Sequence, residues 1–488
     1  MQRQIGKDTL VYLPGRVVPA AMALVTVPIL TRFFTAHDVG RYDLSLRLVT
    51  FLCTFGAFWL STTIMRLYPS YEKRGELDVL GRVVATARLV GLVLGVLVLA
   101  AVWAFGPDSL FGSYRDLLAI AGGVFVSQSL FETGLAMTRA KGRPGRFSMA
   151  SVLNAIIKLP LGIGMALYLT HNISGMLWGT TLVTLAVYAV LMQRDFPYPR
   201  LRLQASEKKA LRETLAYGLP IALSLVLNFL LANSDRFFLK YYRSDAEVGA
   251  FSVVSLLVDQ PIGLVFQTLM LAVFPTVAAA FEMEGRDTTE RLVGRLTRVY
   301  FLLALPACVL MAALAYPIMQ VLPQREEFRQ AYTVGPWLAF ASLAYGLHYY
   351  AALGLHLARR TGQLLMVTLV SIGVNVIGNW LTVPAHGYDA CGVVRLASNI
   401  VLVLTVAACS YRYLRWVIPW KSLLRTAVAA ALTGMCIHFA AARLPVNLLT
   451  LGCLLGLGVV VYAGLLFALR ELRIQEVLGV WRGSPGDT

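Results

Sequence analysis

Charged residues are scarce in this sequence. Only 14% of its 488 residues are Asp, Glu, Lys or Arg, whereas 58% are hydrophobic. Soluble globular chains carry about 25% charged residues and about half apolar residues. The composition therefore excludes a soluble globular protein and predicts a polytopic membrane protein.

Acidic residues are scarcer still. The sequence has 26 Asp and Glu against 43 Lys and Arg, which gives a formal net charge of +17. In a soluble domain this excess would indicate nucleic-acid binding. Here most of the basic residues fall in short loops between apolar runs, where they are the usual signal of membrane topology. We therefore expect no nucleic-acid partner.

Motifs for metal or nucleotide chemistry are also missing. The six cysteines lie in or beside apolar runs without CxxC or Cys/His spacing, and His348 and His356 have no obvious third ligand. Residues Gly6 to Thr9 resemble the end of a phosphate loop but lack the glycine needed five residues earlier. We expect no metal, no bound cofactor and no ATP hydrolysis in this polypeptide.

Apolar runs of about 20 residues, each long enough to cross a bilayer as a helix, recur along the chain. The first run is too long for a signal peptide, so we interpret it as a retained helix. We expect an all-α fold with fourteen transmembrane helices near residues 9–33, 43–67, 80–106, 116–138, 147–169, 173–193, 214–239, 247–281, 296–322, 331–357, 363–383, 390–410, 423–442 and 447–469.

The distribution of basic residues tests this count of helices. With the N-terminus placed inside, the segments expected in the cytoplasm carry 28 Lys and Arg, and the opposite loops carry 7. Such a bias predicts that both termini are cytoplasmic. After the last helix, Glu471 to Trp481 mixes apolar and charged residues, which is compatible with a helix on the inner membrane surface or with a solvated tail.

The start of the chain recurs in its middle. Tyr12, Pro14, Arg32 and Val39-Gly40 have counterparts in a second series, and the spacing from tyrosine to arginine is 20 residues in the first and 19 in the second. The counterparts are Tyr217, Pro220, Arg236 and Val248-Gly249. We expect two pseudo-repeated six-helix lobes of parallel topology, followed by two further helices. The predicted domains are residues 1–193, a basic cytoplasmic linker at 194–213, residues 214–410, and residues 411–488 with the last two helices and a cytoplasmic tail.

Eight basic residues lie inside predicted helices. A charge at the centre of a lipid-facing helix costs about 2.5–3.5 kcal/mol, so several of them should face a wet, cationic cavity. Lys158 is the strongest candidate for binding an anionic head group, because it falls near the bilayer midplane. The other candidate substrate-binding residues are Arg88, Arg47, Arg16 and Arg395.

The remaining in-helix arginines lie closer to span ends. For Arg32, Arg66 and Arg236, interfacial anchoring or an ion pair is the better interpretation. Asp235 precedes Arg236 directly, and together with Arg32 this pair is a candidate gate or anchor at the outer end.

Two acids, Glu132 and Asp259, stand out inside helices. Glu132 should lie at the same depth as Arg88, so the plain interpretation is a salt bridge between them. The alternative is that one of the two carboxylates takes up H⁺ or Na⁺ and couples transport to an ion gradient. Asp259 is the sharper candidate, because Pro261 favours a kink in the same helix.

Short motifs along nearly the whole chain resemble those of one family. They are Pro28-Ile-Leu-Thr-Arg32, Val39-Gly40-Arg-Tyr42, Arg66-Leu-Tyr68, Tyr217-Gly-Leu-Pro220, Asp235-Arg236, Glu247-Val-Gly249 and Asn375-Val-Ile-Gly-Asn379. Together they resemble bacterial polysaccharide flippases of the Wzx type, in the multidrug/oligosaccharidyl-lipid/polysaccharide (MOP) superfamily.

This resemblance implies two lobes in a V, as in MATE transporters, which open alternately to the two sides of the bacterial inner membrane. The implied substrate is an undecaprenyl-pyrophosphate-linked oligosaccharide, held in related lipid II flippases by first-lobe arginines. Membrane lipids, a glycan polymerase and assembly proteins are the implied partners.

Two other functions remain open. A cation-coupled multidrug exporter of the same superfamily would be expected to have a more acidic cavity. A membrane glycan polymerase or ligase would be expected to carry catalytic groups on a large outer loop, whereas the outer loops here have only about four to ten residues. The loop lengths therefore favour a transporter over an enzyme.

Overall fold

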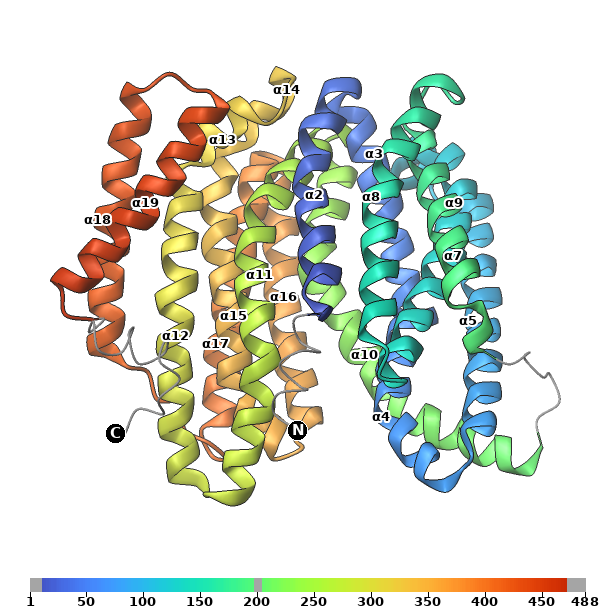
Figure 1. Ribbon diagram of the computed structural model, residues 1–488. Helices are drawn as coiled ribbons and strands as arrows, with labels where there is room; N and C mark the ends of the chain where they lie inside the picture. Colours follow the sequence, from blue (N-terminus) through green and yellow to red (C-terminus); the bar gives the residue numbers. More distant parts are fainter. Residues whose placement is uncertain (1–10, 197–203, 472–488) are drawn as a thin grey trace. The chain divides into compact units, whose positions relative to one another are not determined.

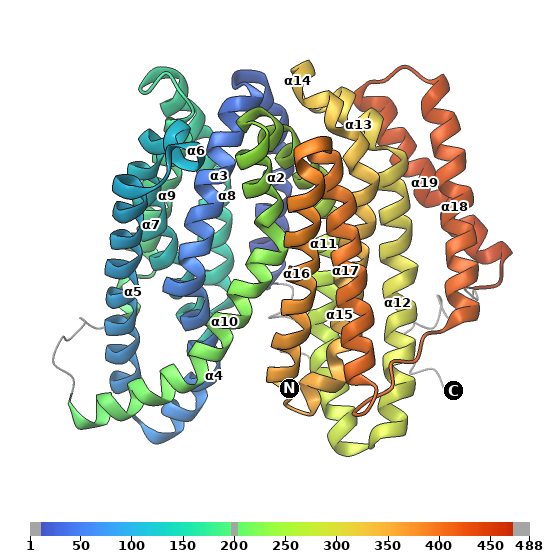
Figure 2. The ribbon, with the colours of Figure 1, turned by 180° about the vertical axis from the view of Figure 1, so that it is seen from behind.

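The computed structural model describes residues 11–196 and 204–471, and in these ranges all regular structure is helical (Figures 1 and 2). Fourteen helical stretches are long and apolar enough to cross a membrane. This confirms the predicted all-α fold and its fourteen spans. The surface helix considered for the C-terminal tail lies outside the described residues from residue 472 onward, and so does part of the predicted linker.

The chain divides into two compact units, Met1–Gly249 and Ala250–Thr488. The predicted lobes, by contrast, are separated at residues 194–213. The two divisions differ mainly in helix α10 (Ala205–Tyr242), which belongs to the first compact unit and packs against α4 and α5 there.

The first unit contains seven long helical stretches. The second of them, Ala36–Arg74, is a continuous span in which a single π-helical turn, η1, joins α3 to α4. The helices are α2 (Pro14–Phe33), α3 (Ala36–Cys53), η1 (Thr54–Phe58), α4 (Trp59–Arg74), α5 (Leu77–Phe105), α6 (Asp108–Phe111), η2 (Gly112–Tyr114), α7 (Arg115–Ala140), α8 (Pro144–Tyr168), α9 (Ser174–Leu191), η3 (Gln193–Asp195) and α10.

Two helices of this unit begin earlier than predicted, because capping residues extend them beyond their apolar runs. Thr35 and Asp38 form a capping box that starts α3 at Ala36, seven residues before the predicted start. Gln204 and Glu207 do the same for α10. The buried Glu207 carboxylate also accepts a 2.6 Å bond from Arg82 on α5, which fixes this end of α10 to the first unit.

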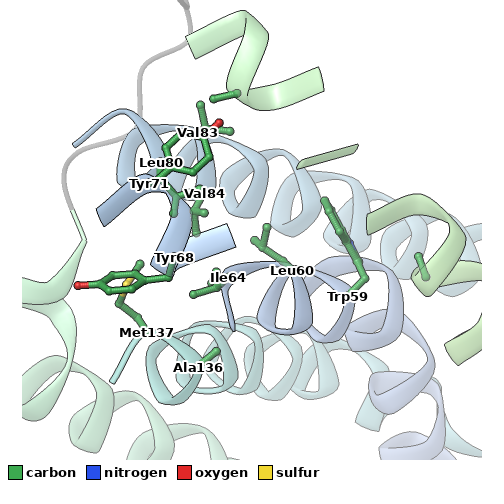
Figure 3. Packing of buried hydrophobic residues seen from close by; sticks show 12 residues of the cluster. Trp59, Leu60, Ile64, Tyr68, Tyr71, Leu80, Val83, Val84, Ala136 and Met137 are labelled. Carbon is green, nitrogen blue, oxygen red and sulfur yellow. The ribbon is translucent and has the colours of Figure 1, made fainter. Parts of the chain in front are cut away.

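A buried apolar cluster holds α4, α5 and α7 together (Figure 3). Leu60 and Ile64 of α4, Val83 of α5 and Ala136 of α7 are all fully buried. Ala210 and Ala222 of α10 join the same cluster. Burying each large aliphatic side chain contributes about 1.5–3 kcal/mol in a soluble protein; in a lipid-facing bundle the corresponding term is tight packing.

The second unit is built around α15, which is the most buried of its spans. Tyr300 of α12 donates a 2.9 Å hydrogen bond to the Leu343 carbonyl of α15, and its ring packs on that of Tyr350. Helices α18 and α19 lie beside α12 (Figure 1). The Tyr462 hydroxyl of α19 donates a 2.9 Å hydrogen bond to the Leu302 carbonyl of α12. The helices are α11 (Asp245–Met283), α12 (Arg286–Ala313), α13 (Ala315–Val321), α14 (Glu326–Arg329), η4 (Gln330–Val334), α15 (Gly335–Leu357), α16 (Thr361–His386), α17 (Tyr388–Ser410), α18 (Trp420–Arg443) and α19 (Leu448–Ala468).

Candidate functional site

A buried charged cluster joins α3 to α10 in the first unit. Asp43 lies one turn before Arg47 on α3, and its carboxylate accepts bonds from the Arg47 guanidinium, the shortest at 2.9 Å. The same carboxylate accepts a 3.0 Å bond from Nε of Arg236 on α10, whose side chain is only 4% exposed. The Asp43 carboxylate therefore pairs with arginines from two helices.

Two further residues of α10 belong to this cluster. Asn233 Oδ1 accepts a 3.2 Å bond from Arg47 Nη1, and an Asp235 oxygen lies 3.9 Å from Arg236 Nη1. The cluster thus includes two arginines and two aspartates. Arg47, a predicted substrate-binding residue, is thus held in place on α3 with a third of its side chain exposed. The predicted gate or anchor pair, Asp235 and Arg236, ties α10 to α3.

Asp43 is a site residue that the sequence patterns do not reveal. The predicted second span begins at residue 43, which places this acid on a loop boundary rather than inside a helix. Because α3 begins at Ala36, Asp43 is two turns inside it. The signal in the sequence is the spacing of four residues between Asp43 and Arg47, which puts opposite charges on one face of a helix.

Lys158 lies deep in α8 and lacks a counter-charge. It follows Pro144, the first residue of the helix, by 14 residues, or about 21 Å. Its side chain is partly buried, and the described part of the chain offers it neither a hydrogen bond nor an ion pair. An unpaired ammonium at this depth costs about 2.5–3.5 kcal/mol in lipid. An anionic ligand would relieve this cost.

Arg88 of α5 is held by aromatic side chains. It donates a 2.9 Å bond to the Tyr188 hydroxyl on α9, and its guanidinium lies 4.2 Å from the centre of the Phe196 ring. No carboxylate from the described residues pairs with it. Its positive charge is therefore oriented but not neutralised.

The predicted salt bridge between Glu132 and Arg88 is wrong. Glu132 accepts a 2.8 Å bond from Gln128, one turn earlier on α7, and the positive charge that acts on it belongs to Arg139. The salt bridge does not form because the Arg88 side chain points toward α9 and Phe196, whereas Glu132 lies on α7. Whether Glu132 takes up a coupling ion stays a prediction.

Arg16 lies apart from Lys158 in the first unit. The starts of α2 and α8 adjoin, since Tyr12 packs on Phe147 with ring centres 5.3 Å apart. Arg16 is exposed near this end of α2, whereas Lys158 is 11 residues beyond Phe147, or about 16 Å along the axis. The structure therefore does not bring Arg16 and Lys158 together.

Arg32 and Arg66 are also exposed. Arg32 lies in the last turn of α2, over the ring of its neighbour Phe33, which fits a place near a span end. Arg66 lies on the outer surface of α4. Neither has a carboxylate partner among the residues that the structure describes.

In the second unit, Arg395 and Asp259 pair with each other. Arg395 Nη1 lies 3.0 Å from Asp259 Oδ2, and this carboxylate also accepts bonds from Ser255, at 2.6 Å, and Ser342, at 2.7 Å. A predicted substrate-binding residue and a predicted ion-coupling residue thus form one polar cluster across α17, α11 and α15. Ion uptake at Asp259 would have to displace the Arg395 guanidinium.

Of the eight basic residues predicted to lie inside spans, seven belong to the first unit and one, Arg395, belongs to the second. Among the described residues, Arg47, Arg236 and Arg395 have carboxylate partners. Those without one are all in the first unit: Arg16, Arg32, Arg66, Arg88 and Lys158. The first unit therefore carries an excess of uncompensated positive charge within its spans.

Two family models match the sequence. A model described as polysaccharide biosynthesis protein matches residues 5–281, which is more than half of the chain. A model described as MatE matches residues 220–381. The sequence has no significant match among curated proteins.

Several solved structures share the fold. The lipid II flippase MurJ, in an inward closed conformation, matches with a TM-score of 0.78 at 13% identity over 95% of this chain and 99% of its own. The Vibrio cholerae MATE transporter VcmN matches with a TM-score of 0.59 at 15% identity over 84% of this chain and 96% of its own. A MOP superfamily transporter from Pyrococcus furiosus matches with a TM-score of 0.57 at 16% identity over 83% of this chain and 93% of its own. At these identities the likeness shows the fold.

Proposed function

Because the chain belongs to the polysaccharide biosynthesis protein family, we propose that it is a flippase that carries an undecaprenyl-pyrophosphate-linked oligosaccharide across the bacterial cytoplasmic membrane. The two family matches confirm the resemblance to the MOP superfamily that its motifs indicated. The observation that carries the substrate proposal is the uncompensated positive charge of the first unit, with Lys158 at its deepest point.

The proposed substrate supplies the charge that these residues lack. The pyrophosphate of such a substrate is esterified at both ends and is a compact dianion, whose oxygens accept charge-assisted hydrogen bonds from ammonium and guanidinium groups. In this account Lys158 binds the pyrophosphate at its deepest position. Arg88 meets the head group separately, nearer the start of α8, because its partner Tyr188 packs in one cluster with Phe147. Asp43 and Asn233 hold Arg47 on α3 as a further contact, and Arg16 meets the head group near the start of α2.

Transport in this proposal proceeds by alternating access, with the isoprenoid chain remaining in lipid. The cation charges stabilise the head group while it is away from water, and they release it when water re-enters. Coupling to H⁺ or Na⁺ is part of the proposal, with Glu132 and Asp259 as the candidate sites. A glycan polymerase and assembly proteins are the proposed partners on the outer side, and both termini are placed in the cytoplasm.

A cation-coupled multidrug exporter is the second candidate function, because the MatE model matches residues 220–381. The two candidates differ in the charge of the substrate. An organic cation would be repelled by Lys158 and Arg88, whereas a pyrophosphate lipid would be attracted.

Transport of both substrate classes by the purified chain in liposomes distinguishes the candidates. We expect translocation of an undecaprenyl-pyrophosphate-linked sugar. We expect no efflux of ethidium, whichever way an H⁺ or Na⁺ gradient is imposed across the liposome membrane. Ethidium efflux without lipid translocation would overturn the proposal. Running the assay with and without each gradient also identifies the coupling ion.

A further inference from the structure

A second basic site lies in the second unit, where α15 turns into α16. A cavity of about 740 Å³ opens there, between this turn and the last turn of α17. No acidic residue lines it. The lining residues are Arg359, Arg360, Gly362, Gln363, Met366, Val367, Ala408, Cys409, Arg412 and Tyr413.

The three arginines of this cavity are not neutralised. None of them has a carboxylate partner among the described residues, and Arg360 instead lies over the Tyr413 ring at 5.9 Å. Two arginines of α12 have carboxylate partners, Arg286 with Glu290, at 2.8 Å, and Arg298 with Glu471, at 2.7 Å. The cavity, by contrast, gathers three arginines and no carboxylate among its lining residues.

The backbone adds a further positive contribution. Helix α16, of 26 residues, begins at Thr361 beside the cavity, and its first turn contains no acid. The N-terminus of a helix carries a partial positive charge and free N–H groups. The cavity is thus faced by three guanidinium groups and by an uncompensated helix N-terminus.

Arg359 holds a backbone conformation that is costly for it. Its φ is +56°, and the Arg360 N–H closes the end of α15 with a 2.9 Å bond to the Leu355 carbonyl. At the turns that contain Gly75, Gly142 and Gly285 the residue with positive φ is a glycine, which adopts this conformation without strain. His171, at the α8–α9 turn, is another residue with a side chain that adopts it. Arg359 therefore presents its side chain at the cavity at a cost in backbone strain.

The inner wall of the cavity is apolar. Met366 and Val367 lie on α16 about 8 Å beyond the arginine rim, and Ala408 faces them from α17. Met366 is 68% exposed, like many large apolar side chains on the surfaces of the spans. Tyr411 and Trp416 lie in the segment that follows α17, and aromatic residues of this kind are enriched at membrane interfaces. The ligand that fits has an anionic head and an apolar body.

We propose that this cavity binds the phosphate headgroup of an anionic phospholipid from the leaflet that faces the α15–α16 turn. Arg359, Arg360 and Arg412 bind the phosphate oxygens, and Met366 and Val367 contact the start of the acyl chains. The site is separate from the uncompensated cations of the first unit, and it does not depend on the substrate proposed above.

Binding of phosphatidylglycerol by the purified full-length chain tests this proposal. Native mass spectrometry in detergent would measure retained phosphatidylglycerol against phosphatidylcholine, with inorganic phosphate added as a competitor. We expect the wild type to retain phosphatidylglycerol preferentially. Arg359→Gly and Arg412→Gln should each weaken this retention about fivefold, the contribution of one basic residue at an anionic surface.

The control is Arg291→Gln, an exposed arginine at the start of α12 that does not line the cavity, and it should retain lipid as the wild type does. Arg359→Gly should also melt at the same temperature or higher, because glycine relieves the backbone strain. Wild-type retention by Arg359→Gly and Arg412→Gln would overturn the proposal. So would equally effective competition by millimolar inorganic phosphate, since the site would then recognise a free anion.

Discussion

At the scale of single residues, the first unit depends on one acid shared by two arginines. Asp43 bonds both Arg47 and Arg236, and the latter is almost completely buried. A buried cation that loses its partner is destabilised by about 3–5 kcal/mol. The position of Arg47 therefore depends on the same carboxylate that keeps α10 in the first unit.

Asp43→Asn should strongly destabilise the protein, because it removes the charge that compensates Arg236. We expect a lower apparent Tm and faster loss of monodisperse protein in detergent. The matched control is Asp116→Asn, since Asp116 is 60% exposed and pairs with Arg41 at the surface. Exposed pairs contribute at most about 1 kcal/mol, so this variant should behave as the wild type. Equal stability of the two variants would refute the buried-cluster account.

Substitutions in the Arg395–Asp259 pair distinguish a structural role of Asp259 from a role in ion coupling. If the pair is structural, Asp259→Asn and Arg395→Gln should each lower the Tm, and the double variant should recover part of the loss, with a coupling of about 0.5–3 kcal/mol. Thermal unfolding of the four proteins gives this coupling. If Asp259 instead binds the coupling ion, Asp259→Asn should abolish gradient-driven transport with little change in Tm.

At the scale of helices, the repeated Val-Gly motifs are in contact. A Cβ atom added to Gly40 would overlap the Asp245 carbonyl, and one added to Gly249 would overlap the Ala36 carbonyl. The start of α3 and the start of α11 therefore approach backbone to backbone, as small residues allow in membrane proteins. The motif that identified the repeat in the sequence is also a packing contact.

Gly40→Ala should disrupt this contact, because the backbone on the other side cannot yield as a flexible side chain would. Overpacking of this kind costs about 1–3 kcal/mol. Gly164→Ala in α8 is the control, since nothing lies within 4 Å of a Cβ there. In a helix interior this change stabilises by up to about 1 kcal/mol. A Tm for Gly40→Ala at or above that of Gly164→Ala would contradict the close approach.

The helices themselves were largely predictable, because length and hydropathy decide which runs cross a bilayer. Their starts were less so. Thr35 and Gln204 extend α3 and α10 through polar residues that a hydropathy window excludes. The partners of charged residues were the least predictable, as Arg88 shows. Its partners, Tyr188 and Phe196, lie about 100 residues away in sequence, and depth alone does not fix the direction of a side chain.

At the scale of the whole molecule, the balance of charge is uneven between the two compact units. Of the eight basic residues predicted to lie inside spans, the one in the second unit, Arg395, is paired, whereas five of the seven in the first unit have no carboxylate partner among the described residues. A membrane protein that leaves such charges unpaired needs an anion or water beside them. In our proposal the pyrophosphate of the substrate has this role, with Lys158 as its central contact.

The most direct measurement is the rate at which the reconstituted chain translocates a pyrophosphate-linked sugar, compared between the wild type, Lys158→Ala and Lys158→Arg. Loss of a charged hydrogen bond of about 1.5–3 kcal/mol predicts a rate about 10- to 100-fold lower for Lys158→Ala. Lys158→Arg, which keeps the charge, should retain most of the rate. Unchanged translocation by Lys158→Ala, at equal protein abundance in the liposomes, would contradict the central claim.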